Sequence, residues 1–152
     1  MSEPVNVFEI ETEADDGQPA GYRNRTRPLR ELLGASVLGA TVWELDPGQS
    51  TCPYHYENVE EEWVYVLIGT PILRDPDGEH ELAPGDLVCF PPAPEGGHKL
   101  TNRSDSTVRI LMLSTQPEVS ICVYPDSDKV GVWPPGGRYR MSDKLGYWDG
   151  EI

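Results

Sequence analysis

The feature that most constrains this chain is a series of short apolar runs separated by turn-forming residues at even intervals. The runs fill residues 35–124 and are rich in Val, Ile, Thr and aromatic residues, which favour strands. Pairs such as Pro47-Gly48 and Pro84-Gly85 end individual runs, and Asp77-Gly78 is a strong hairpin signal. The only helix expected is a brief one at residues 29–33. The pattern predicts an all-β chain, a sandwich or barrel of short antiparallel strands.

The length of the chain, 152 residues, predicts one domain around one core. Residues 1–34 are expected to supply an N-terminal strand near residues 5–10 and the short helix, both packed on the barrel. Residues 35–124 are expected to form the barrel itself. Residues 125–152 are rich in Pro, Gly and aromatic residues, so we expect an irregular tail packed over the barrel.

The charge of the chain limits its partners. The formal net charge is −14, which argues against nucleic acid or an anionic membrane surface as a partner, because like charges repel. No apolar run approaches the ~20 residues that a membrane-spanning helix needs, and the N-terminus does not resemble a secretory signal. Cys52, Cys89 and Cys122 lack the spacing of a disulfide or zinc framework, which indicates a reducing compartment. We therefore expect a cytoplasmic protein.

One carboxylate is expected inside the barrel. In the run at residues 62–68, Glu62, Val64 and Val66 share one face because strand side chains alternate. The apolar members of this face predict that it points to the interior. A carboxylate buried there needs a cation, hydrogen-bond donors or a proton. The alternative is that Glu62 is a solvated surface charge, since it ends the run Glu60-Glu61-Glu62.

Three histidines occur in the chain. His55 and Glu57 are two positions apart, so on an extended strand both side chains lie on one face, close enough to share a small ion. His98 follows a Gly-rich loop. His80 lies within the predicted hairpin and is expected to be an ordinary surface residue.

The order and spacing of these residues resemble the two motifs of the cupin superfamily. The first motif is matched by Gly48, His55, Glu57, Glu62 and Gly69. The second is matched by Gly85, Asp86, Pro91, His98 and Asn102. The resemblance implies a cupin (jelly-roll) β-barrel, and more narrowly a small bacterial single-domain cupin.

The resemblance also implies a metal site. His55, Glu62 and His98 match three ligands of the usual site with three histidines and one glutamate, while Glu57 occupies the position of the second histidine. A second carboxylate would neutralise a divalent ion and make it a weaker Lewis acid, with Fe, Mn, Ni and Zn all remaining candidates. Glu57 is therefore either a fourth ligand or a neighbour of the ligands, and in the second case a candidate general base.

Two functions remain open from the sequence. The first is a metal-dependent enzyme acting on a small oxygen-rich molecule, with dioxygenase, isomerase or lyase chemistry. The second is a non-catalytic module that binds a sugar-like or acidic small-molecule ligand, with or without metal. A homodimer is also expected, because the N-terminal strand and the aromatic tail would otherwise leave apolar surface exposed.

Overall fold

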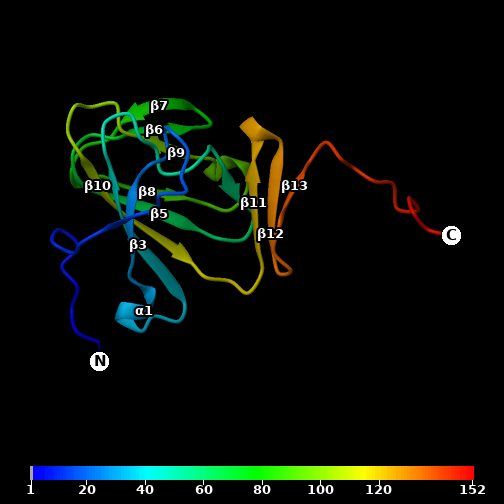
Figure 1. The fold of residues 1–152 in the computed structure, drawn as a ribbon, viewed down its shortest axis with the longest axis horizontal. Helices are drawn as coiled ribbons and strands as arrows, with labels where there is room; N and C mark the ends of the chain where they lie inside the picture. Colours follow the sequence, from blue (N-terminus) through cyan, green and yellow to red (C-terminus); the bar gives the residue numbers. More distant parts are fainter. Residues whose placement is uncertain (1) are drawn as a thin grey trace.

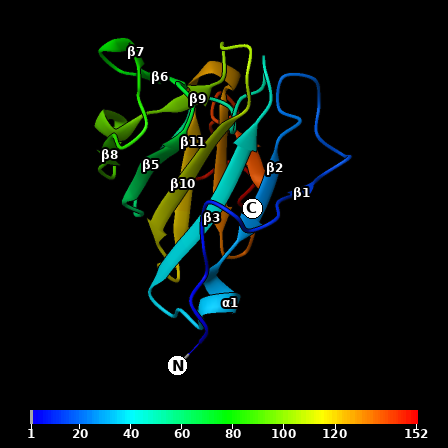
Figure 2. The ribbon, with the colours of Figure 1, turned by 90° about the vertical axis from the view of Figure 1, so that its left-hand side faces the viewer.

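The computed structural model describes residues 2–152, and most of its regular secondary structure consists of antiparallel strands (Figure 1). The largest sheet has six strands. In spatial order they are β1 (Glu13–Ala14), β2 (Arg25–Pro28), β3 (Leu38–Leu45), β10 (Val108–Thr115), β5 (Glu62–Ile68) and β8 (Leu87–Phe90). Figure 2 shows β3, β10 and β5 side by side, with the short helix near one end of β3. This sheet forms one wall of the barrel.

The opposite wall consists of two smaller sheets. One contains β13 (Arg138–Arg140), β12 (Lys129–Trp133), β11 (Ser120–Tyr124) and β4 (Tyr56–Glu57). The other contains β7 (Gly78–Glu81), β6 (Ile72–Asp75) and β9 (Lys99–Thr101). Isolated bridges between Ser50 and Thr101 and between His55 and His98 join the two. The arrangement is that of a jelly-roll barrel and confirms the fold class that the sequence predicts.

The core lies between these walls. Strand alternation places Val64 and Val66 of β5 inward, in register with Met112 and Ile110 of β10. Leu100 of β9 closes the core from the opposite wall. Burial of this apolar surface is the main stabilising contribution to the barrel. Because Glu62 has the same parity as Val64 and Val66, it faces the interior too, as the alternation predicts.

The single α-helix of residues 2–152 is as brief as the sequence predicts. Helix α1 spans Arg30–Leu33 and ends at Gly34, whose φ of 63° is the left-handed conformation that glycine adopts without strain. Leu29, just before it, is buried. Two 3₁₀ turns complete the helical content, η1 (Pro94–Gly96) and η2 (Pro125–Ser127). Within residues 2–152 no helix has the length and apolar character needed to cross a membrane.

The N-terminal segment differs from the prediction. Residues 5–10 form a turn, because the side chain and carbonyl of Asn6 accept hydrogen bonds from the backbone N–H groups of Phe8, Glu9 and Ile10. The strands of this region are instead β1 and β2, which extend the large sheet beyond β3. The expected strand near residues 5–10 was therefore wrong, since a local side-chain bond overrode the apolar pattern.

The C-terminal region also differs from the irregular tail that the sequence predicts. Residues 129–140 contain β12 and β13, which extend the sheet of β11. Only the chain beyond Met141 is irregular, and it extends away from the barrel instead of covering it (Figure 1). Its side chains Tyr147 and Trp148 are 86% and 74% exposed. A homodimer that would cover this surface stays a prediction.

Candidate metal centre

Two histidines stand side by side on the small-sheet wall of the barrel. His55 immediately precedes β4 and His98 immediately precedes β9. Their backbones pair reciprocally, with N–H to O distances of 3.2 and 2.8 Å. An antiparallel pair of this kind places both side chains on one face, and the ring centroids are 4.6 Å apart. The strand pairing thus brings together two residues that are distant in sequence.

Glu62 meets both imidazoles from the opposite wall. It is the first residue of β5, and its Oε2 lies 3.5 Å from Nε2 of His55 and 3.5 Å from Nε2 of His98. The side chains of His98 and His55 are 1% and 8% exposed. One ligand atom from each residue lies within 4.8 Å of the other two. The geometry is that of a site for a single small cation.

Backbone carbonyls hold both rings in the same orientation. Nδ1 of His55 lies 3.1 Å from the carbonyl oxygen of Pro53, and Nδ1 of His98 lies 2.9 Å from that of Gly96. A carbonyl only accepts, so Nδ1 carries the hydrogen and Nε2 of the neutral ring presents a lone pair. Phe90 stacks on His98 with an interplanar angle of 8° and fixes its plane. Such support of the ring away from its ligand atom is typical of metal-binding histidines.

Two buried polar atoms of this group have no hydrogen-bond partner among the described residues. Burial lowers the pKa of His98 to about 4, so its imidazole is neutral at neutral pH. Burial acts to raise the pKa of Glu62, but the two imidazoles beside its carboxylate, His55 above all, hold it below the ordinary value. Within residues 2–152 neither His98 Nε2 nor Glu62 Oε2 has a hydrogen-bond partner, although both are buried. A divalent cation would satisfy both atoms, so these residues fit a metal.

His55 is the proton-holding member of the group. Burial lowers its pKa, but Cys52 and Glu62 beside the ring outweigh burial and raise it to about 11. The Sγ atom of Cys52 lies 3.5 Å from Nδ1 of His55, a contact that the motif spacing did not indicate. A metal at Nε2 must displace the His55 proton, so binding is coupled to proton release.

Glu57 lies beside this group instead of within it. Its carboxylate groups with His55 and Cys122, whose ligand atoms also lie within 4.8 Å of one another. Cys122 is directly opposite Glu57 in the pairing of β4 with β11, a register that no local sequence signal reveals. Burial and the neighbouring carboxylate of Glu60 raise the pKa of Glu57 to about 8. Glu57 therefore holds a proton near neutral pH, and its role as a ligand stays a prediction.

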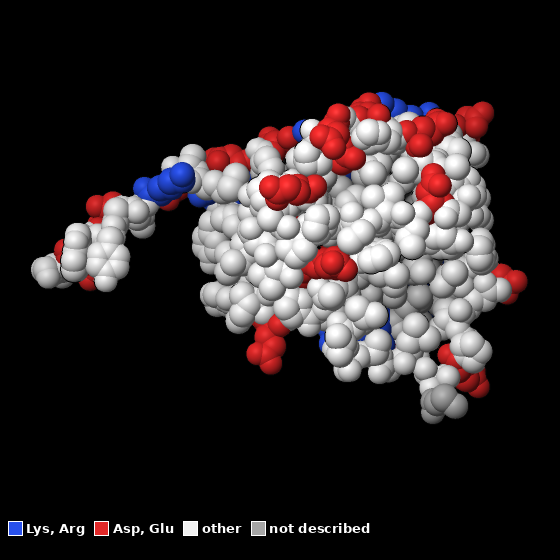
Figure 3. Space-filling model, turned by 180° about the vertical axis from the view of Figure 1, so that it is seen from behind, with Lys and Arg blue, Asp and Glu red and all other residues white. Residues whose placement is uncertain are grey.

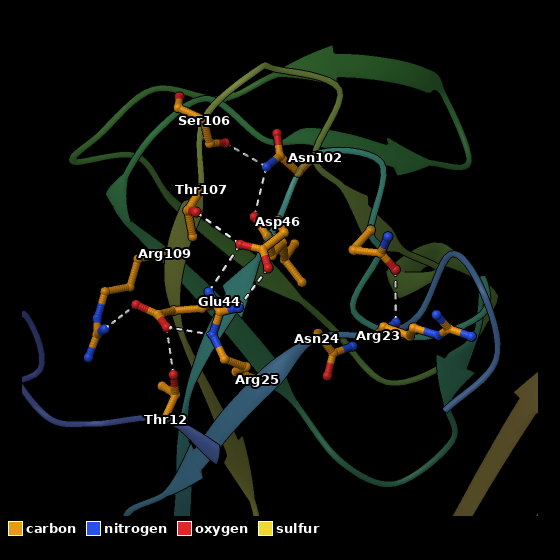
Figure 4. Close-up of polar contacts among 12 residues, drawn as sticks. Thr12, Arg23, Asn24, Arg25, Glu44, Asp46, Asn102, Ser106, Thr107 and Arg109 are labelled. Atoms are coloured by element: carbon orange, nitrogen blue, oxygen red, sulfur yellow. Dashed lines mark hydrogen bonds and ion pairs between the residues drawn. The ribbon is translucent and has the colours of Figure 1, made fainter. Parts of the chain in front are cut away.

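The two remaining candidate residues, His80 and Asn102, make contacts that support the fold. His80 is exposed on β7, and its Nε2 lies 3.1 Å from Oδ1 of Asp75. Asn102 is fully buried, and its Nδ2 donates to the carbonyl oxygens of Leu45 and Ser106 at 2.7 and 2.8 Å. The bond to Leu45 ties the loop after β9 to the end of β3, and the bond to Ser106 closes that loop (Figure 4). Neither residue lines the candidate metal centre.

A cavity of about 660 Å³ leads from the surface to this centre. His55 and Glu62 are among the residues that line this cavity, and Trp43 and Met112 form part of its apolar wall. Thr41, Ser114 and Gln116 add polar groups, and Arg30 lies among the lining residues of α1. A cavity of this volume accepts a small-molecule ligand of monosaccharide size.

The comparisons with known proteins agree with this architecture. Residues 41–114 match the family described as Cupin domain. No curated protein matches the sequence. A solved structure of a sugar phosphate isomerase of the cupin superfamily from Silicibacter pomeroyi is 25% identical and has a TM-score of 0.81. The similarity covers 97% of this chain and 98% of that one.

Two further solved structures are similar. A candidate sugar phosphate isomerase from Acidithiobacillus ferrooxidans has a TM-score of 0.82 at 24% identity, over 92% of this chain and 91% of that chain. A polyketide cyclase from Streptomyces resistomycificus has a TM-score of 0.62 at 25% identity, over 76% and 80% of the two chains. Because the barrel, the family match and these neighbours all agree with the motif spacing, the chain belongs to the cupin superfamily, as a small cupin domain protein.

Proposed function

We propose that this protein holds a divalent transition metal at His55, Glu62 and His98 and acts as an enzyme on a small oxygen-rich molecule. One observation carries the proposal. A neutral imidazole nitrogen of His98 and an ionised oxygen of Glu62 are buried face to face, and within residues 2–152 neither has a hydrogen-bond partner. Such an arrangement is costly unless a cation binds there.

The residues around the site have separate tasks in this proposal. A bound metal would hold and polarise substrate oxygens. The carbonyls of Pro53 and Gly96 keep both Nε2 atoms aimed at one point, and Phe90 covers the outer face of the His98 ring. Trp43 and Met112 shield the inner cavity from water. The substrate is thereby oriented with two of its oxygens toward His55 and Glu62.

Glu57 is the candidate acid–base residue. With its pKa raised to about 8, its carboxyl group carries a proton that can be exchanged near neutral pH. Its grouping with His55 places this proton next to the ligand set. Proton transfer between neighbouring carbons of a hydroxy-carbonyl compound needs such a group. The similarity to the Silicibacter pomeroyi protein, whose name is sugar phosphate isomerase, therefore supports isomerase chemistry over dioxygenase or lyase chemistry.

Metal analysis of the purified protein tests the proposal. The wild type is expected to contain close to one Fe, Mn, Ni or Zn ion per chain, and His98→Ala is expected to contain almost none. His80→Ala is the matched control, because His80 is exposed on the β7 hairpin and should keep the full metal content. A wild-type protein that arrives without metal and binds none of the four added ions would refute the metal site.

A second measurement separates an enzyme from a binding module. Glu57→Gln should retain the metal and lose aldose–ketose interconversion of sugar phosphates, followed by NMR, by at least about tenfold. A wild type that binds metal and sugar phosphate but converts neither sugar form would identify a non-catalytic binding protein instead. We place this activity in the cytoplasm, since Cys52, Cys89 and Cys122 are free thiols.

A further inference from the structure

Arg30 is the first residue of α1 and lines the same cavity as His55 and Glu62, and it is exposed whereas His55 is buried. Its guanidinium donates to three neutral oxygens. Nε donates to the carbonyl of Ala35 at 3.4 Å, Nη2 to that of Ser36 at 3.2 Å, and Nη1 to Oε1 of Gln116 at 3.3 Å. A guanidinium has five N–H donors, so two remain for a ligand.

Of the two arginines that line the cavity, Arg27 and Arg30, only Arg30 has no acidic partner among the described residues. Five arginines form ion pairs with carboxylates, namely Arg25, Arg27, Arg74, Arg103 and Arg109. Arg27 also lines the cavity, but Glu13 engages it. The chain has 26 acidic and 12 basic residues, so the missing partner does not reflect a shortage of acids. Arg30 therefore brings to the cavity a positive charge that contacts only neutral oxygens of the chain.

A row of polar groups connects Arg30 to the candidate metal centre. Gln116, which accepts from Arg30, donates through Nε2 to Oγ of Ser114 at 2.8 Å. Ser114 of β10 stands directly across from Glu62 of β5. Directly opposite residues share a face of the sheet, so Ser114 lies between the mouth and the metal ligand.

Gly39 makes room for this row. It is buried on β3, directly across from Ser114. A Cβ atom at Gly39 would lie 2.6 Å from Nε2 of Gln116 and 3.1 Å from Oγ of Ser114. Any larger residue would therefore push the Gln116 amide away from Ser114, so the row depends on a glycine at this position.

We propose that the substrate carries an anionic group, a phosphate or a carboxylate, at the end remote from the metal, and that Arg30 binds this group at the cavity mouth. Gln116 and Ser114 donate to or accept from substrate hydroxyls between the two ends. The inference rests on the proposed function, since it names the class of substrate that the same cavity takes. Two N–H donors of a planar guanidinium match two oxygens of either anion.

Calorimetric titration with three probes tests this assignment. Ribose 5-phosphate, ribonate and ribose have similar size and hydroxyl content, and differ in carrying a phosphate, a carboxylate or no charge. At low salt at least one anionic probe should bind about tenfold or more tightly than ribose, and the tighter of the two identifies the anion. Equal binding of all three probes, or no binding of either anion at millimolar concentration, would overturn the proposal.

Variants assign the preference to Arg30. Arg30→Gln should remove most of the tenfold preference, and Arg30→Lys should restore only part of it, because an ammonium lacks the forked geometry. Glu31→Gln should strengthen anion binding, since Glu31 also lines the mouth and repels anions. Arg140→Gln is the matched control, with the same change of charge on exposed β13. A preference that survives in Arg30→Gln would overturn the role of Arg30.

The same titrations on metal-free and metal-loaded protein separate this inference from the proposed function. If the metal site fails but the anion preference persists and depends on Arg30, the cavity binds an anionic ligand without metal chemistry. If metal binds and sugar phosphates are converted while Arg30→Gln behaves as the wild type, the proposed function stands and the present inference is refuted. Melting temperatures of all variants show whether the loss of the Ala35 and Ser36 contacts has disturbed the fold.

Discussion

The carboxylates on the two faces of the large sheet have opposite surroundings. On the outer face, Glu44 of β3 contacts Arg25, Arg109 and Thr12, and Asp46 contacts Arg25 and Thr107 (Figure 4). On the inner face, Glu62 of β5 meets two imidazoles, and its buried Oε2 has no hydrogen-bond partner within residues 2–152. Strand parity alone decides which carboxylate is inside. The outer carboxylates are paired with arginines, whereas the inner one keeps a buried oxygen without a hydrogen-bond partner among the described residues.

The outer network also holds the N-terminal segment. Nε of Arg109 donates to the carbonyl of Val7 at 2.8 Å, and Nη2 donates to that of Ile10. The same guanidinium bonds Oε1 of Glu44 at 2.5 Å. The charge of Arg109 is thus paired with a carboxylate of the chain, whereas the guanidinium of Arg30 contacts only neutral oxygens. On the face seen in Figure 3, acidic side chains gather along one edge beside a few basic ones, and scattered acidic side chains lie elsewhere.

The largest expected effect comes from removing Arg109. Arg109→Met leaves the Glu44 carboxylate partly buried without its arginine and frees the carbonyls of Val7 and Ile10. Breaking a fully buried pair costs about 3–5 kcal/mol, and because Glu44 is 21% exposed we expect about 2–4 kcal/mol. Urea unfolding measures the change. A loss below about 1 kcal/mol would show that the outer network is not structural.

A smaller effect distinguishes Glu62 from Glu44. At a metal concentration one hundred times the dissociation constant, the wild type should gain about 2.7 kcal/mol of stability on adding metal. Glu62→Gln should lose this gain, because the ligand carboxylate is removed. Glu44→Gln should be destabilised with and without metal alike. Thermal melts give both results, and a metal gain retained by Glu62→Gln would contradict its role as ligand.

The smallest effect is the acid sensitivity of the outer network. The hydrogen bond from Arg25 holds the pKa of Asp46 below its ordinary 3.8, against the effect of burial. Burial acts to raise the pKa of Glu44, but Thr12, Arg25 and Arg109 together hold it below 4.5. Depressed folded-state pKa values stabilise the fold above about pH 4.5 and lose this contribution as the pH falls below the ordinary values. The contribution should fade steadily on acidification.

Arg25→Gln measures that contribution. The variant should be less stable than the wild type at neutral pH, and the difference should shrink as the pH falls below 4, because the protonated carboxyls no longer attract Arg25. Urea unfolding at several pH values follows the difference. A difference independent of pH would mean that Arg25 acts through packing of its aliphatic stem.

Much of the fold is predictable from local pattern. The alternation at residues 62–68 matches β5 in both bounds, and the Asp-Gly hairpin and the Gly34 helix end are where the sequence indicates. The β12–β13 pair was missed because its Pro- and Gly-rich composition resembles an irregular loop. Strand pairing there is decided by the free edge of β11, which a local pattern does not contain.

The candidate site, like the fold, is predictable only in part from the sequence. Motif spacing indicated His55, Glu62 and His98, and the structure places their ligand atoms within 4.8 Å. Cys52, Cys122 and Arg30 were not indicated. Cys122 reaches Glu57 through the register of β4 with β11, and Arg30 reaches the cavity through the position of α1 beside β3. Neither relation has a signal within a short window of sequence.

The sequence by itself determined the β class, the inward parity of Glu62 and the residues of the cupin motifs, because side-chain alternation and turn chemistry are local properties of the backbone. Only the tertiary structure decided the rest. It grouped Glu57 with His55 and Cys122, paired Glu44 with Arg109 and left Arg30 in contact with neutral oxygens. These outcomes depend on which strands become neighbours, since burial and charge pairing act between segments far apart in the chain.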